Sequence, residues 1–439
     1  MFGIADVKLS NFYRNLARDS FWAVVGNGLG NGLLLLAGIL IARLLGADLY
    51  GEYGVVKSTM MYSATFATFG LGITATKYIS QYIQQHCARA LRIIHDTLFI
   101  TFIFSTFVAI CLLIGAGWIA EWKEAQNLTL AFRMLSVIII VKALVTAQQG
   151  ILAGLGDFKN VGINNIFSGL SMLVFATGLT YLWGLRGALA ALLLSQVVCL
   201  VLNFVVIRKH KKELVTEEQD VHNYIPELLR FSLPVAMQEG LYAICNWLAI
   251  MALKQYASEG DVGIFTAALQ WNLLVQMIPN LLANVVLAHL SGTTQDKQAH
   301  KSTLRTMMVV NIACAIVPFA VIFPLCGFIS TFYGAGFESM AVVLKILLLD
   351  AVFFSITTVL KSEFLATGHN WWLLIIRALK DLSLVILVYV LLLHSPQDWS
   401  GAICFAVAYV GASFIYLLAA ICGYGYFKII EHKKKVVHG

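Results

Sequence analysis

Ionisable side chains within long apolar stretches are the residues of this sequence that are placed to do chemistry. Lys57, Lys142 and Glu239 each lie in such a stretch, and none has an opposite charge three or four positions away. A charge inside a membrane is costly, so it marks a binding or ion-handling position by default. An ammonium group there can hold an anion, and a carboxyl group can take up and release a proton. We therefore expect these residues to act in ligand binding and energy coupling.

Glu239 is the leading candidate for energy coupling. It follows Pro234 by five residues, and a proline inside a helix leaves one carbonyl without its usual donor and allows the helix to bend. A permanent ion pair with Lys142 or Lys380 is the alternative role for this carboxylate. Asp350, in a later apolar stretch, is the second candidate coupling residue.

Other polar residues fall on shared faces of the predicted helices, because residues three, four and seven positions apart lie on one side of a helix. For a single polar face, packing against neighbouring helices is the simpler interpretation and a water-filled cavity is the functional one. Together with Lys57 and Lys142, the candidate binding residues are Asn27, Asn31, Thr68, Asn246, Asn272, Gln276, Asn280, Lys361, Arg377 and Lys380.

Some charges and glycines have spacings that indicate structural roles. Arg377 with Asp381, and Arg92 with Asp96, are four residues apart, which favours self-neutralising pairs on one helix. Gly26 to Gly30 has GxxxG spacing, as does Gly28 to Gly32, and we expect close helix packing or bending there in preference to dimerisation.

The elements that must position these residues are transmembrane helices. The chain has 439 residues, of which 59% are hydrophobic and 12% charged, whereas a soluble domain carries about 25% charged residues. The predicted fold class is therefore an all-α integral membrane protein with twelve transmembrane helices. The predicted spans are 21–45, 51–79, 93–118, 128–153, 161–183, 187–207, 228–253, 262–290, 303–326, 341–366, 371–393 and 401–427.

The two halves of the chain repeat each other at an offset of about 213 residues. Leu45–Tyr53 resembles Tyr256–Phe265, and Leu152–Asp157 resembles Leu365–His369. We predict two six-helix lobes, 1–219 and 220–439. The polar faces mark the first two helices of each lobe, so these four helices can line a cleft of the kind used by alternating-access carriers.

Basic residues predict the orientation of the chain. About 19 Lys and Arg residues fall at one predicted membrane face and about four at the other. Both termini are therefore expected on the cytoplasmic side. This topology accounts for the net charge of +7, so no nucleic-acid partner is expected.

The sequence offers no sign of enzymatic chemistry. It lacks a GxxxxGK phosphate-binding loop, and its ten histidines and eight cysteines do not have the spacing of metal ligands. No loop is long enough to form a soluble catalytic domain. We expect no catalytic residue, no metal site and no cofactor.

Residues 38–79 carry a resemblance to a known family, in the run GILIARLLGADLYGEYGVVKSTMMYSATFATFGLGITATKYI. This run resembles the first helix pair of Wzx-type oligosaccharide flippases, in the polysaccharide transport branch of the superfamily that includes multidrug and toxin extruders. The basic end of the sixth span and the sequence FSLP, which contains Pro234, also suit that family.

The resemblance implies two six-helix bundles related by a pseudo-twofold axis along the membrane normal. It implies a bacterial inner-membrane flippase for undecaprenyl-pyrophosphate-linked oligosaccharide repeat units, moved to the periplasmic leaflet for O antigen, capsule or exopolysaccharide. It also implies membrane lipids, a polysaccharide polymerase and a chain-length regulator as partners.

Two other functions stay open. A cation-coupled multidrug exporter of the same fold is the main alternative, because Glu239 and Asp350 would suit a cationic drug. A membrane glycan polymerase or lipid-linked glycosyltransferase is disfavoured, because such enzymes generally carry a large external loop or an acidic nucleotide-sugar motif. Lys57 and Lys142, with no acid deep in the spans of the first half, favour a pyrophosphate-bearing cargo.

Overall fold

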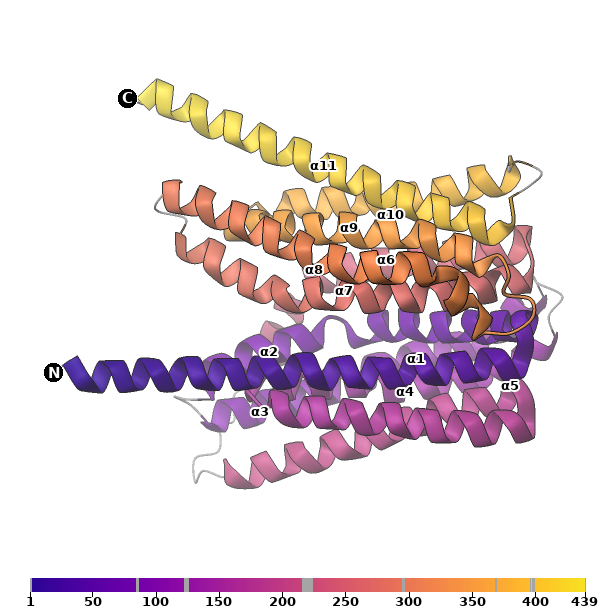
Figure 1. Ribbon diagram of the computed structural model, residues 1–439. Helices are drawn as coiled ribbons and strands as arrows, with labels where there is room; N and C mark the ends of the chain where they lie inside the picture. The colour runs from indigo at the N-terminus through magenta and orange to yellow at the C-terminus, as the bar shows by residue number, and fades with distance from the viewer. Residues whose placement is uncertain are drawn as a thin grey trace. The chain divides into compact units, whose positions relative to one another are not determined.

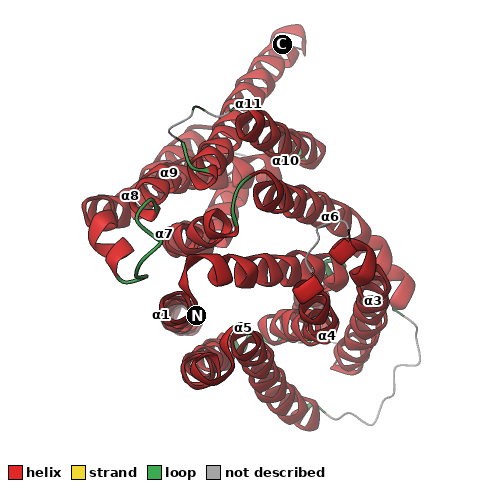
Figure 2. Cartoon of the chain, turned by 90° about the vertical axis from the view of Figure 1, so that its right-hand side faces the viewer, coloured by secondary structure: helices red, strands yellow, loops and turns green. Residues whose placement is uncertain are grey.

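Helices form nearly all of the described chain (Figure 1). The computed structural model describes residues 2–83, 87–121, 126–214, 224–293, 297–367, 369–394, 396 and 399–438. Figure 2 shows helices joined by loops, with no strand in these ranges. A helix satisfies its own backbone hydrogen bonds, which is what an apolar bilayer requires. The predicted all-α class is confirmed.

Eleven helices lie within the described ranges. They are α1 (Phe2–Thr68), α2 (Leu71–Tyr82), α3 (Cys87–Glu121), α4 (Gln126–Gly154), α5 (Phe158–Glu213), α6 (Ile225–Tyr256), α7 (Glu259–Thr293), α8 (Lys297–Thr331), α9 (Met340–Ala366), α10 (Asn370–Leu393) and α11 (Gly401–His438).

Two of these helices are each interrupted by one glycine. Gly46 in α1 has φ 77° and ψ 174°, and Gly184 in α5 has φ 57° and ψ −133°. Positive φ of this kind is accessible to glycine at little cost. The two positions coincide with predicted turns, after residues 45 and 183, so α1 and α5 each cover two predicted spans.

The prediction of one uninterrupted helix over residues 51–79 is wrong, because two helices cover this range. The chain leaves helical geometry at Phe69, with φ 52°, and at Gly70, with φ 67°, so α1 ends at Thr68 and α2 begins at Leu71. The Phe69 ring stacks on Phe104 of α3 at a centroid distance of 4.6 Å. Stacking of this half-buried aromatic pair is a favourable contact at the break.

Eight helices are long and apolar enough to cross a membrane, judged by length and composition within the described residues. They include α1 and α5, whose interruptions divide them further. The count of twelve spans and the cytoplasmic position of both termini stay predictions.

The chain forms two compact units. Unit 1 comprises Met1–Leu45 and Val56–Ala243, and unit 2 comprises Gly46–Val55 and Ile244–Gly439. In unit 1, α4 packs against α2, α3 and α5; in unit 2, α9 packs against α7, α8 and α11. The predicted lobe boundary at 219–220 lies outside the described residues and stays a prediction.

Glycines bring α1 and α5 of unit 1 into backbone contact. A Cβ on Gly26 would overlap the Cα of Gly162, and a Cβ on Gly30 would lie 2.8 Å from the carbonyl oxygen of Asn165. Helices approach this closely only where side chains are absent. The close packing predicted from Gly26 and Gly30 is confirmed.

We expect Gly26→Ala to lower the free energy of unfolding by about 1–3 kcal/mol, because the added methyl group would overlap the backbone of α5. The measurement is the unfolding temperature of the purified chain in detergent. Gly32→Ala is the matched control on the same helix, since no atom lies within 4 Å of its Cβ position. Equal losses of stability in the two variants would contradict the packing role.

Candidate functional site

A buried carboxyl group in unit 2 brings three of the predicted residues together. Asp350 of α9 is 3% exposed. Its Oδ2 atom accepts a hydrogen bond of 2.9 Å from Nδ2 of Asn272 and one of 2.7 Å from Nε2 of Gln276. Asn272 and Gln276 lie one turn apart on α7, so both amides reach the same carboxyl group.

The side chains that contact Asp350 are neutral amides. Within the described residues, no basic side chain pairs with Asp350, and the Oδ1 atom of Asn272 is buried without a hydrogen-bond partner. A carboxylate buried in a membrane is stabilised by binding a proton or a cation. The described part of the chain holds no group of three His, Cys, Asp or Glu side chains that would bind a metal ion. The described contacts of Asp350 are therefore to neutral amide donors.

A cluster of charged and aromatic residues lies on α10 and α11 of the same unit. Arg377 Nε and Asp381 Oδ2 are 3.8 Å apart, and Asp381 is 1% exposed, which confirms the predicted pair. The ammonium group of Lys380 lies 5.8 Å from the ring centroid of Tyr409 and 5.6 Å from that of Tyr416. The aromatic faces stabilise the ammonium group without neutralising it. The cluster therefore carries net positive charge that suits an anion.

A chain of half-buried amide side chains lies in unit 1. Asn165 of α5 donates from Nδ2 to Oδ1 of Asn27 on α1, at 2.7 Å, and Gln149 of α4 donates to Oδ1 of Asn165, at 2.8 Å. These bonds join three helices. None of the three side chains titrates, so this chain keeps its charge constant as pH changes.

The predicted cations Lys57 and Lys142 both belong to unit 1. Lys142 is half-buried on α4, within electrostatic range of Cys199 of α5, which is 2% exposed. No acidic side chain pairs with Lys142 in the described ranges. Lys57 is half-buried on α1 and makes polar contacts.

The other predicted residues differ in burial. Glu239 of α6 is half-buried in unit 1 and has contacts of its own. Thr68 is buried, and its hydroxyl donates to the carbonyl of Ala64 at 2.6 Å, within its own helix. Asn246 is buried, whereas Asn31, Asn280 and Lys361 are exposed.

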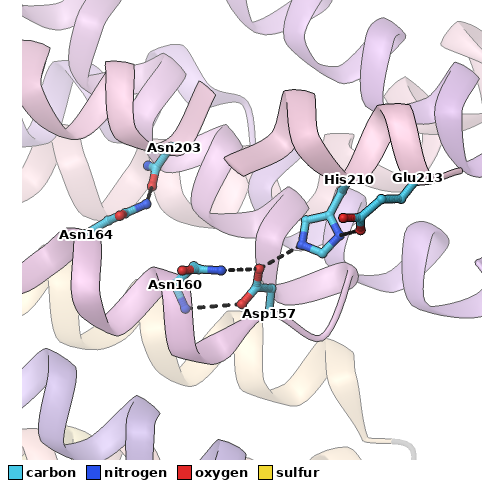
Figure 3. A network of polar contacts seen from close by, with 6 residues as sticks. All are labelled: Asp157, Asn160, Asn164, Asn203, His210 and Glu213. Atoms are coloured by element: carbon cyan, nitrogen blue, oxygen red, sulfur yellow. Dashed lines mark hydrogen bonds and ion pairs between the residues drawn. The ribbon is translucent and has the colours of Figure 1, made fainter. Parts of the chain in front are cut away.

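A titratable network that sequence reasoning missed joins the two ends of α5 (Figure 3). Asp157 caps the start of the helix, accepting from the backbone N–H of Asn160 at 3.2 Å and from its Nδ2 at 2.7 Å. Nε2 of His210, near the end of α5, lies 2.7 Å from Oδ2 of Asp157. Figure 3 also shows Asn164 donating to Asn203, at 2.8 Å, between the same two halves of α5.

Hydrogen bonding shifts the pKa of Asp157. Burial raises the pKa of its carboxyl group, but the hydrogen bonds from Asn160 and His210 outweigh burial and hold it below its usual value. The sequence does carry a signal for half of this network, because an Asp directly before a helix is a typical N-cap. His210 is 53 residues away from Asp157, and no local pattern indicates that contact.

Solved structures with the same fold are membrane transporters. An inward-facing multidrug resistance MATE transporter of the MOP superfamily matches with a TM-score of 0.74 and 18% identity, over 94% of this chain and 99% of that one. The lipid II flippase MurJ in an inward closed conformation matches with a TM-score of 0.71 and 16% identity, over 92% of this chain and 87% of that one. The chain therefore has the fold of the MATE and MurJ transporters.

The family follows from the sequence match. A family model described as polysaccharide biosynthesis protein matches residues 16–288, which is more than half of the chain, so the chain belongs to this family. The EPS I polysaccharide export inner membrane protein EpsE of Ralstonia nicotianae is 21% identical over 370 residues, covering 81% of this chain and 83% of that protein. The resemblance inferred from residues 38–79 is confirmed.

We expect Asp157→Asn to remove a pH-dependent part of the stability. Because the pKa of Asp157 is lower in the folded chain than in the unfolded one, its contribution is present above about pH 4 and is lost as pH falls through the folded value. The wild type should exceed the variant by about 1 kcal/mol near neutral pH and match it in acid, while Asn keeps the helix cap.

Unfolding temperatures at several pH values measure this difference. Glu213→Gln is the control, because Glu213 is 57% exposed and lies 3.8 Å from His210. A constant gap between wild type and Asp157→Asn across the pH range would contradict the role of the carboxylate.

Proposed function

We propose that the chain is a flippase that moves undecaprenyl-pyrophosphate-linked oligosaccharide repeat units from the cytoplasmic to the periplasmic leaflet by alternating access. Its membership of the polysaccharide biosynthesis family and its fold support this function. The relative EpsE, named as a polysaccharide export inner membrane protein, supports a bacterial inner-membrane location and a surface polysaccharide as the product. In this proposal a polysaccharide polymerase and a chain-length regulator act on the exported units.

Half-buried lysines without acidic partners in the described residues are the observation that favours an anionic cargo. Within the described residues, Lys142 and Lys380 have no acidic partner, and Tyr409 and Tyr416 stand beside Lys380. Ammonium groups in a medium of low dielectric bind pyrophosphate strongly. Tyrosine rings also provide flat apolar surfaces with a polar edge, which suit sugar rings. We propose Lys57, Lys142 and Lys380 as ligands of the pyrophosphate.

A cation-coupled multidrug exporter is the second candidate. The buried Asp350 and the fold shared with MATE transporters favour it. A carboxylate in a cavity attracts organic cations, whereas unpaired lysines repel them. An assay with both kinds of cargo separates the two functions.

We expect Lys142→Ala to lower the rate of flipping about tenfold or more, because a charge-assisted bond to phosphate is lost. The assay uses the purified chain in liposomes with an undecaprenyl-pyrophosphate oligosaccharide that carries a fluorophore on its sugar. The fraction of fluorophore that dithionite quenches reports the outer leaflet. Lys57→Ala should have a similar effect.

Lys345→Ala is the matched control, because Lys345 is an exposed lysine whose ammonium lies 5.7 Å from the ring centroid of Phe323. It should flip at the rate of the wild type. Flipping of the lipid by Lys142→Ala at the wild-type rate would refute the assigned role. Transport of a cationic dye without transport of the lipid would favour the exporter.

We propose Asp350, ahead of Glu239, as the coupling residue. Asp350 is buried between neutral amide donors, whereas Glu239 is half-buried. The amide chain of unit 1 does not titrate. Proton or cation binding at Asp350 can thus change the charge of the unit 2 interior and bias one conformation.

An imposed pH or sodium gradient across the liposomes tests this assignment. We expect Asp350→Asn to flip the lipid at a rate that no longer responds to either gradient, because the neutral amide keeps the shape of the carboxyl group without its charge. Glu239→Gln should keep the response. The opposite result, with the response lost only in Glu239→Gln, would move the coupling site to α6.

A further inference from the structure

The chain passes from unit 1 to unit 2 inside α1, and this crossing coincides with a break in the helix. Residues up to Leu45 belong to unit 1, and Gly46–Val55 belong to unit 2. Gly46 has φ 77° and ψ 174°, which is a backbone region essentially restricted to glycine. Helical geometry is therefore interrupted at the residue where the unit changes.

The other two crossings between the units lie within regular helix. The chain returns to unit 1 between Val55 and Val56 of α1, and it passes to unit 2 again between Ala243 and Ile244 of α6. Neither position departs from helical geometry. Sharp bends in helices need a local break, so Gly46 is the crossing at which the chain can change direction most easily.

Residues 46–55 are held against α7 by close backbone contact. A Cβ on Gly51 would overlap the carbonyl of Glu259, and a Cβ on Gly263 would overlap the carbonyl of Ala47. Helices come this close only where side chains are absent from the contact. The contact therefore fixes residues 46–55 to the first turns of α7.

A buried tyrosine adds a second attachment of the same residues to unit 2. The hydroxyl of Tyr50 accepts a hydrogen bond of 2.9 Å from Nε2 of Gln270 on α7. Its ring centroid lies 5.9 Å from that of Phe337, which is also fully buried. Phe337 belongs to the loop between α8 and α9. Residues 46–55 are thus held from two directions by parts of unit 2.

Gly46 itself is not part of this packing. No atom of another residue lies within 4 Å of the position that its Cβ would occupy, apart from its chain neighbours and the nearby helix backbone. The glycine is therefore needed for its backbone conformation and not for space. Gly184 of α5 has the same character, with φ 57°, ψ −133° and open space around it, but the chain on both sides of Gly184 belongs to unit 1.

We propose that Gly46 is a hinge, across which residues 46–55 move with unit 2 while the helix before Gly46 moves with unit 1. Hinges are a few residues, often at the ends of elements, that absorb a large change in φ and ψ. Glycine has the widest choice of φ and ψ, and the open space around Gly46 allows this change without a clash. The hinge acts in the same way for any cargo.

Pulsed electron paramagnetic resonance on the full chain in lipid nanodiscs measures which residues move together. Spin labels are attached through a ketone-bearing amino acid, so the native cysteines stay in place. The labelled positions are Ile114 in unit 1, Phe328 in unit 2 and Leu49 in residues 46–55, all of which are exposed. The 49–328 distance should have a narrow distribution, and the 49–114 distance should be as broad as the 114–328 distance. The hinge is refuted if 49–328 is as broad as 49–114.

Gly46→Ala tests the hinge residue directly. Because alanine rarely adopts positive φ, the variant should narrow the 114–328 distribution about twofold and slow flipping in liposomes about tenfold. Gly184→Ala is the matched control, since it imposes the same restriction within unit 1. It should lower the unfolding temperature by a similar amount and keep the wild-type distances and flipping rate.

Two results with these variants would overturn the hinge. One is a wild-type distance distribution in Gly46→Ala, and the other is an equal change of the distances in both glycine variants. If Gly46→Ala does not fold, the comparison of 49–328 with 49–114 in the unmodified backbone still decides. The distances need no cargo, so a wild type that flips no lipid would contradict the proposed function and leave the test of the hinge intact.

Discussion

The cost of burying charge in an apolar medium governs the arrangement of this chain. An isolated ion loses several kcal/mol of hydration when it enters a protein interior, so each buried charge needs a partner. Asp381 meets Arg377, Asp350 meets two amides, and Lys380 meets tyrosine faces. Only the first of these solutions neutralises the charge. The other two leave a charge that a ligand, a proton or a cation can satisfy.

Contacts between glycines determine where polar side chains meet. In unit 1, Gly26 packs on Gly162, and the next residue, Asn27, is hydrogen-bonded to Asn165. In unit 2, Gly51 packs against the backbone of Glu259, and the preceding residue, Tyr50, accepts a hydrogen bond from Gln270 of α7. A short polar side chain reaches across a helix interface only when the backbones are close. The small residues therefore position the polar groups as well as pack the helices.

The two units differ in the polar contacts that join their helices. In unit 1, half-buried amides join α1, α4 and α5, and Asp157 meets His210 across the two ends of α5. In unit 2, the buried carboxyl group of Asp350 accepts hydrogen bonds from two amides of α7. Within the described residues, neutral amides therefore join helices in both units, but only in unit 2 do they hold a buried carboxyl group.

The sequence by itself determined the helical class, the positions of most helices and the faces on which polar residues lie. The reason is that apolar length and the helical repeat are local properties: Asn272 and Gln276 share a face whatever they pack against. The tertiary structure alone decided that Asp350, 78 residues beyond Asn272, is their partner, and that His210 meets Asp157. It also decided the break at Phe69 and Gly70, where the Phe69 ring stacks on Phe104 of another helix. A side chain's partner depends on how helices pack and in what register, and this comes from backbone contacts between residues far apart in the chain.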